Sequence, residues 1–172
     1  YDPSTGRWVN HHHIQNDPTS LNGNVVTVLK YTPDNTMWIG TDGGGASFLS
    51  PYQKPFHRFA PPGMDGYGEK GMAVQSALCD SHGDVWMGTA AEGLLRVPHG
   101  TELPVSYLNG ARDRFSVRDN SVTAIAEDRR GVLWVGKLNG VSRFDRENNR
   151  FRNVPLEQET EKRNIHVTCI RE

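Results

Sequence analysis

The sequence has 172 residues, enough for one domain with a hydrophobic core, and a formal net charge of −1. This near-neutral balance gives no electrostatic reason to expect a nucleic acid or an anionic membrane surface as a partner. No stretch approaches the roughly 20 apolar residues of a membrane-spanning helix, and neither cysteine lies in the ligand spacing of a zinc module. We therefore expect a segment with no cofactor, no bound metal and no direct membrane insertion.

A three-fold internal repeat organises the chain. Three tetrapeptides recur 48 residues apart: Trp38-Ile39-Gly40-Thr41, Trp86-Met87-Gly88-Thr89 and Trp134-Val135-Gly136-Lys137. A valine lies twelve residues before each tryptophan, with no gap needed. A fixed period of this length predicts supersecondary units that bury their faces by stacking on one another.

Residues 1–23 are expected to hold the end of a preceding unit and a connection. Residues 1–8 match residues 144–151 position for position, as an aromatic residue, a turn and an aromatic residue that opens an outer strand. The run His11-His12-His13 follows, and histidine is the commonest metal ligand. Because neighbouring side chains on a strand point to opposite faces, at most two of the three would converge, so we expect an exposed loop or edge instead.

The first full unit covers residues 24–60, with strands expected at 25–31, 37–41, 46–49 and 56–59. The turn Pro33-Asp34-Asn35 separates the first two strands, and Asp42-Gly43-Gly44-Gly45 separates the next two. A glycine-rich run also occurs in phosphate-binding loops, but those need a following helix to supply backbone donors. A strand follows here, so a phosphate site is not expected.

Two further units follow in the same pattern. The unit at 72–108 has strands expected at 72–79, 84–88, 94–97 and 105–108, and the unit at 120–154 has strands expected at 122–127, 132–136, 141–144 and 151–154. Within residues 164–172, the segment 165–170 is expected to begin a fourth unit. No helix of ordinary length is readable in the sequence.

Four short strands per unit, joined by hairpin turns, predict an all-β fold: a β-propeller of four-stranded antiparallel blades. A linear β-solenoid is the alternative, but its coils are mostly shorter and lack paired hairpins. Trp38, Trp86 and Trp134 are expected to wedge between blades. Gly40, Gly88 and Gly136, inside strands where glycine is normally unfavourable, are expected to mark the close approach of another chain segment.

The residues of the third unit resemble a known family. Asn120-Ser121-Val122, Glu127-Asp128, Gly131, Leu133-Trp134-Val135-Gly136 and Gly140-Val141 are similar to the two-component regulator propeller repeat. The resemblance implies a seven-bladed periplasmic sensor region of a hybrid histidine-kinase regulator, of which this chain would hold about three and a half blades. It also implies sensing of glycans or their breakdown products. The chain departs from the pattern at Thr32 and Pro33, where an acidic pair is usual, and at Lys137, where threonine is usual.

The leading functional hypothesis is a ligand-binding sensor that does no chemistry. Propellers present the loops after the second and fourth strands around a central channel, and in this chain these loops carry the candidate ligand-binding residues Asp42, Glu92, Lys137, Asn139, Tyr67 and Arg112. A scaffold for protein–protein interaction is the first alternative, because fold does not fix function. A propeller lyase or glycosidase is the second, but no motif supports Asp42 and Glu92 as a catalytic pair.

The ends of the chain carry a further expectation. Val167 corresponds to Val122, so the tryptophan of the fourth unit would fall beyond Glu172. An open arc of blades exposes apolar faces and unpaired strand edges. We therefore expect the partners to be an oligosaccharide or other small ligand and the remaining blades of the same polypeptide or another chain, a homodimer included.

Overall fold

The structure is a computed structural model that describes residues 4–50, 53–59, 72–101, 103–110, 115–117, 119–155 and 167–170. The first sheet consists of β1 (Val26–Tyr31), β2 (Met37–Thr41), β3 (Gly45–Ser50) and β4 (Gln53–Phe59). The second consists of β5 (Val74–Cys79), β6 (Val85–Thr89), β7 (Leu94–Val97) and β8 (Val105–Tyr107). The third consists of β9 (Val122–Glu127), β10 (Leu133–Lys137), β11 (Gly140–Asp145) and β12 (Arg150–Val154). Over these described ranges there is no helix, and so none that could span a membrane.

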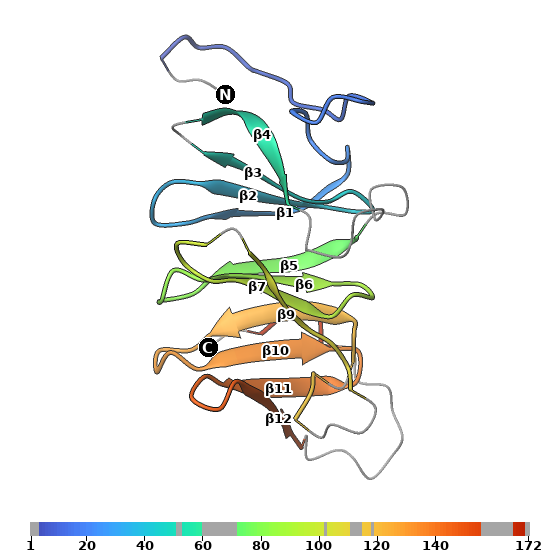
Figure 1. Cartoon of the computed structure of the whole chain (residues 1–172), viewed down its shortest axis with the longest axis vertical. Coiled ribbons are helices and arrows are strands. Elements are labelled where there is room, and N and C mark those ends of the chain that lie inside the picture. The colour runs from blue at the N-terminus through green and yellow to red at the C-terminus, as the bar shows by residue number, and fades with distance from the viewer. Residues whose placement is uncertain are drawn as a thin grey trace.

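Each sheet is an antiparallel meander in which consecutive strands are neighbours. Figure 1 shows the three sheets following one another along the long axis of the molecule. Their first strands are in contact, β1 with β5 and β5 with β9, and a buried cluster of apolar side chains lies at each of the two sheet contacts. The predicted all-β fold of four-stranded blades, with first strands at the expected places, is therefore confirmed.

The glycine of each second strand lies where the next unit approaches. A Cβ atom on Gly40 would be 2.7 Å from Val74 Cγ1, and one on Gly88 would be 2.6 Å from Val122 Cγ1. A Cβ on Gly136 would be 2.7 Å from Val167 Cγ1. Because real Cβ atoms do not come so close to another heavy atom, only glycine allows this spacing of the sheets. The predicted reason for the repeated glycine is confirmed.

We predict that Gly88→Ala destabilises the protein by about 1–3 kcal/mol, because the added methyl group overpacks the contact between the second and third sheets. Its Cβ would lie 2.7 Å from the carbonyl oxygen of Val122, which is backbone and cannot turn aside. Gly43→Ala is the control, since a Cβ there meets nothing within 4 Å and only its positive φ of 79° opposes the change. Urea unfolding in which Gly88→Ala loses less stability than Gly43→Ala would contradict the close-approach role.

A β-bulge recurs in every first strand and was not anticipated from the sequence. The pairing register shifts after Val26 in β1, after Val74 in β5 and next to Val122 in β9. In β1 and β9 the extra residue is a threonine whose hydroxyl donates to a carbonyl of the following unit, Thr27 to Val74 and Thr123 to Val167. The bulge thus aims a polar side chain across the sheet contact.

Trp38 and Trp86 occupy the predicted wedge between sheets. Trp38 is 9% exposed in the core between the first and second sheets, and Trp86 is fully buried between the second and third. Trp134, the equivalent residue of the third sheet, is half-buried. The indole N–H groups of Trp86 and Trp134 donate to Asp80 Oδ2 and Asp128 Oδ2, residues 48 apart in the sequence. The predicted burial between sheets is confirmed for Trp38 and Trp86, whereas Trp134 shares their position in the repeat but is only half-buried.

Two expected strands are not formed. Trp8, expected to open an outer strand, is 82% exposed, and residues 8–25 contain no strand. Of the segment 165–170, the described residues 167–170 contain no strand, although the amide of Val167 donates to the carbonyl of Lys137 at 3.2 Å. A strand needs a paired neighbour, and neither segment is joined as a further strand to any of the three described sheets.

Candidate ligand-binding site

Three of the four described residues of the predicted ligand face lie in equivalent turns of the three sheets, and the fourth, Lys137, is the last residue of β10. Asp42 is exposed between β2 and β3, Glu92 is half-buried between β6 and β7, and Asn139 is exposed between β10 and β11. The Nδ2 of Asn139 donates to Asp119 Oδ2 at 3.0 Å, and no hydrogen bond joins these three residues to one another. Tyr67 and Arg112 lie outside the described residues. The turns place these groups at one end of the strands without assembling them into a cluster.

Lys137 is not a surface group as expected. Its side chain is 2% exposed, and its ammonium donates to the Val117 carbonyl at 2.9 Å and to Ser142 Oγ and Asn153 Oδ1 at 2.7 Å. In the other two units this position is a threonine whose hydroxyl donates to the carbonyl of Gly45 or Gly93. Lysine here is longer, so it reaches through the sheet to the connection before β9. Its donors bind the protein itself, which does not support a ligand contact.

We predict that Lys137→Met costs about 1–3 kcal/mol of stability, because it leaves buried acceptors without their donor while keeping the bulk of the side chain. Chemical denaturation of the two proteins gives the difference directly. Unchanged stability would mean that the ammonium is not holding these acceptors and would return Lys137 to the candidate ligand face.

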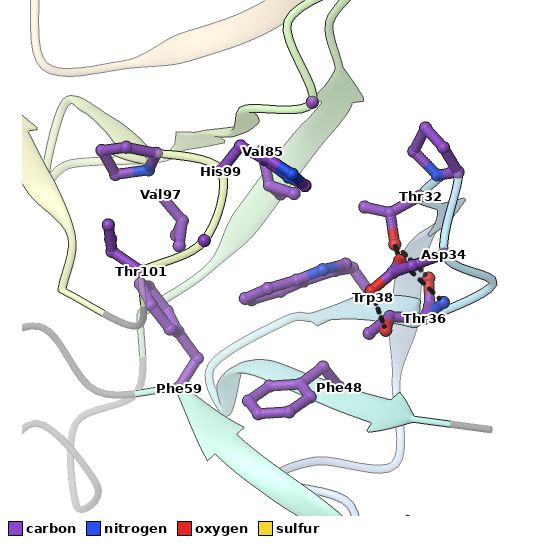
Figure 2. A pocket seen from close by; sticks show the side chains of 14 residues that line it. Thr32, Asp34, Thr36, Trp38, Phe48, Phe59, Val85, Val97, His99 and Thr101 are labelled. Carbon is purple, nitrogen blue, oxygen red and sulfur yellow. Dashed lines mark hydrogen bonds between the residues drawn. The ribbon is translucent and has the colours of Figure 1, made fainter. Parts of the chain in front are cut away.

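A cavity of about 360 Å³ lies at the opposite end of the strands, between the first and second sheets. The β1–β2 turn, the β5–β6 turn and the segment after β7 surround it. Its floor is apolar and mostly buried, formed by Trp38, Phe48, Phe59, Val85 and Val97. Figure 2 shows the indole of Trp38 at its centre; the ring centroids of Phe48 and Phe59 lie 5.1 Å and 5.4 Å from the indole centroid.

The rim of the cavity is polar. Asp34 accepts hydrogen bonds from the Thr32 hydroxyl and from the amide and hydroxyl of Thr36, the last two at 3.2 Å and 3.0 Å. The Thr32 hydrogen bond is the main reason that the pKa of Asp34 lies below its ordinary value, so this carboxyl group is ionised at neutral pH. On the other side, the backbone amide of His99 donates to Asp84 Oδ1 at 2.8 Å.

Gly83 sets the position of the His99 ring. A Cβ on Gly83 would lie 2.9 Å from His99 Nδ1, so the imidazole packs directly against the glycine backbone. Gly83 has a φ of 83°, which glycine adopts readily and which the turn between β5 and β6 requires. The repeat thus supplies a rigid turn on which this imidazole rests.

The corresponding place between the second and third sheets is filled by charged side chains. Arg146 forms ion pairs with Asp80 and, at 3.5 Å, with Asp84, and its guanidinium carbon lies 5.9 Å from the Trp86 ring centroid. Arg96 lies 5.4 Å from the same ring centroid and pairs with Asp84 at 2.7 Å. This contact between sheets has no room for a ligand at its tryptophan.

Four substitutions at equivalent positions distinguish the two contacts. Thr32 and Thr36 stand where the second unit has Asp80 and Asp84, and Phe48 stands where it has Arg96. His99 corresponds to Arg146, since each lies three residues after the residue that pairs with the tryptophan of its unit. At these four positions the first contact has neither the cations nor the acids of the second contact, and a cavity remains there. The departure at Thr32 and Pro33 was the sequence signal for this cavity, but only the structure shows what the departure opens.

No cluster of three or more histidine, cysteine, aspartate or glutamate residues that fits a metal ion occurs in the described part of the chain. Of the three consecutive histidines, His13 has its Nδ1 2.7 Å from the Leu21 carbonyl oxygen. His11 packs edge-on against Phe56, with ring centroids 4.9 Å apart. These contacts hold His11 against β4 and His13 against the connection before β1.

The comparisons with known proteins agree with the fold. Residues 20–43 and 116–136 match the model of the family described as two component regulator propeller. The comparison with curated proteins gives no match.

Solved structures share the fold at low sequence identity. The extracellular domain of BT4673 of B. thetaiotaomicron, described as a one component system, is 21% identical, with a TM-score of 0.66, over 87% of this chain and 19% of that one. The extracellular domain of the hybrid two component system BT3049 of the same organism is 20% identical, with a TM-score of 0.63, over 79% of this chain and 18% of that one. Virginiamycin B lyase of Staphylococcus aureus is 15% identical, with a TM-score of 0.57, over 87% of this chain and 45% of that one.

This chain thus spans less than a fifth of the two extracellular domains and under half of the lyase. The family match covers the connection and first two strands of the first unit and the same elements of the third. Together with the three stacked sheets, it confirms the resemblance seen in the residues: residues 20–43 and 116–136 are similar to the two component regulator propeller repeat.

Proposed function

We propose that this chain is part of the extracytoplasmic, periplasmic sensor region of a two-component signalling protein, and that the region binds a glycan or its breakdown product without transforming it. The observation that carries the proposal is the family match at residues 20–43 and 116–136. The extracellular domains that share the fold support it. A histidine kinase elsewhere in the polypeptide is part of the same proposal.

The described residues favour binding over catalysis. A glycosidase or lyase needs two groups that converge on the reacting bond, and Asp42 and Glu92 lie in turns of different sheets with no hydrogen bond between them. The cavity at Trp38 instead combines an apolar aromatic floor with a few polar rim groups, which is the usual composition of a small-molecule binding site. The loops that carry Asp42, Glu92 and Asn139, with Tyr67 and Arg112, are the second proposed place for a ligand contact.

A docking role for the first sheet is a second candidate, because one of its faces is exposed. Val26 is 44% exposed, whereas its counterparts Val74 and Val122 are fully buried under the preceding sheet. Leu29 and Tyr31 of the same strand are 57% and 61% exposed. An exposed apolar patch of this kind marks an interaction surface. We propose that another sheet of the same repeat, from the same polypeptide or from another chain, covers it.

Titration calorimetry of the purified chain against a panel of oligosaccharides tests the sensor proposal, with product analysis of each mixture after prolonged incubation. We expect saturable heat with at least one glycan and no cleavage products. Turnover that is abolished by Asp42→Asn or Glu92→Gln would instead identify an enzyme. A panel with neither binding nor turnover would contradict the glycan-sensor proposal.

A further inference from the structure

We propose that the cavity at Trp38 binds one ring of a neutral sugar, with the apolar face of the sugar on the aromatic floor and its hydroxyl groups at the polar rim. This inference rests on the proposed glycan-sensing function and deepens it by assigning the site and the charge class of the ligand. It also places the site at the end of the strands opposite to the turns that carry Asp42 and Glu92.

The floor fits the carbon-bound hydrogens of a sugar ring. Sugar rings have one face of C–H groups, and the negative π-face of an aromatic ring attracts such weakly positive hydrogens while apolar surface is removed from water. Trp38, Phe48 and Phe59 present three aromatic rings to one cavity. The volume of about 360 Å³ lies within the range of roughly 300–1,000 Å³ that is usual for small-ligand sites.

The rim fits hydroxyl groups that both donate and accept. Asp34 is ionised and can only accept, so it suits sugar hydroxyls as donors. Thr32, Thr36 and Thr101 have hydroxyl groups, which both donate and accept, and the His99 imidazole adds a further polar group. Thr32, Thr36 and Asp34 already form one hydrogen-bonded turn, so the Asp34 carboxylate is held in place before a ligand arrives.

The charge of the cavity selects against acidic ligands. Among the described residues that line it, Asp34 is the one with a formal charge at neutral pH, and no lysine or arginine is present. The equivalent place in the second contact holds Arg96 and Arg146. A uronic acid or a sugar phosphate would thus meet a carboxylate with no cation to offset it, whereas a neutral sugar meets only hydrogen-bonding groups.

The second sheet contact also shows how to close the cavity. The double variant Thr32→Asp/His99→Arg introduces the two residue types that meet as Asp80 and Arg146 at Trp86. Because the chain already accommodates this pair at an equivalent position, the variant is expected to fold and to fill the cavity with a guanidinium group. Thermal unfolding of the variant checks that it folds.

The test is titration of the chain with a neutral monosaccharide and oligosaccharide panel and with the corresponding uronic acids. We expect neutral sugars to bind and uronic acids to bind at least tenfold more weakly. Asp34→Asn should weaken neutral-sugar binding about tenfold, as loss of a charged hydrogen-bond acceptor does. The double variant should abolish it. Glu147→Gln, an exposed carboxylate in the turn between β11 and β12, is the matched control and should bind as the parent does. Asp42→Asn and Glu92→Gln test the second proposed place, at the other end of the strands.

The outcomes separate this inference from the function on which it rests. Glycan binding that survives Asp34→Asn and the double variant, or that is lost in Asp42→Asn or Glu92→Gln, overturns the cavity site while the sensor function stands. Preference for uronic acids overturns the charge argument. Absence of glycan binding by the parent chain overturns both. If the double variant fails to unfold cooperatively, Asp34→Asn and the neutral-versus-acidic comparison decide the question.

Discussion

Replacing Trp86 by alanine should lower the free energy of unfolding by about 3–5 kcal/mol, the cost of deleting a fully buried large aromatic side chain. The indole has no exposed surface and packs against Tyr107 and Phe144, with ring centroids 5.8 Å and 5.1 Å away. It also donates to the carboxylate of Asp80 at 2.5 Å. The substitution therefore removes apolar contacts from both the second and third sheets and leaves a buried acceptor with one donor fewer.

Trp134→Ala is the matched control for this prediction. Trp134 occupies the same position of its unit and makes the same indole hydrogen bond, to Asp128 at 2.9 Å, but it is only half-buried. Urea titrations followed by circular dichroism should show a clearly larger loss for Trp86→Ala than for Trp134→Ala. Equal losses would mean that packing between sheets contributes little and that the hydrogen bond within the unit accounts for the effect.

The repeat made most of the fold predictable. The tryptophan and the glycine recur at a fixed spacing because each packs against the next sheet in the same way at each contact. The tryptophan fills the space between the sheets, and the glycine leaves room for a valine of the next sheet. The turns at Asn35, Gly83 and Gly131 recur for a local reason, since all three residues have positive φ. Each of these signals is carried by a single residue position, so it can be recognised from one sequence without an alignment.

The connections before the first and third units were less visible in the sequence, although they too are equivalent. Leu21 and Val117, 96 residues apart, are both buried. The carbonyls of Thr19 and Phe115, two residues earlier in each case, accept from the amides of Phe56 and Phe151. Leu21 and Val117 are both apolar, but Thr19 and Phe115 share neither size nor polarity, so the residue pattern does not show that the two segments are equivalent. The role of these two segments depends on backbone hydrogen bonds to the fourth strand of each unit, β4 and β12, and a pattern of side chains does not predict such bonds.

The candidate site was the least predictable part, because it depends on combinations of residues. Lysine at a turn is normally exposed, and Lys137 is buried only because Val117, Ser142 and Asn153 together supply three acceptors. The cavity at Trp38 likewise depends on positions far apart in the sequence, which carry neither the acids nor the cations found at the second contact. A single departure such as Thr32 could be read from the chain, but its consequence required knowing that His99 lies where Arg146 lies in the next contact.

The ion pair that fills the second contact leads to the other large expected effect: Asp80→Asn should cost about 3–5 kcal/mol at neutral pH, the usual cost of removing one partner of a buried ion pair. The change removes the nearest carboxylate from Arg146 and leaves it Asp84 at 3.5 Å and Glu127 at 3.9 Å. The Asp80 side chain has no exposed surface, and its carboxylate accepts from Arg146, from Trp86 and from the amides of His82 and Asp84. The carboxamide keeps the shape but loses the charge that faces the Arg146 guanidinium.

The same residue gives this loss a defined pH dependence. Burial by itself would raise the pKa of Asp80, but the hydrogen bonds from Arg146 and Trp86 and the charge of Arg146 outweigh it, so the folded-state pKa lies below the ordinary value. A depressed folded-state pKa means that the stabilisation is complete above the unfolded-state pKa of about 3.9 and is lost as the pH falls through the folded-state pKa. The stability difference between the parent and Asp80→Asn should therefore be full at pH 7 and shrink on acidification below about pH 4.

Asp128→Asn is the matched control, since Asp128 accepts from Trp134 and from backbone amides but is not among the carboxylates that Arg146 contacts. Denaturant unfolding of the parent and both variants at a series of pH values measures the two differences. Asp80→Asn should be the more destabilising at pH 7. A loss that does not change between pH 7 and pH 3 would show that the Asp80 side chain acts through its shape and hydrogen bonds alone, and that its charge does not hold the second and third sheets together.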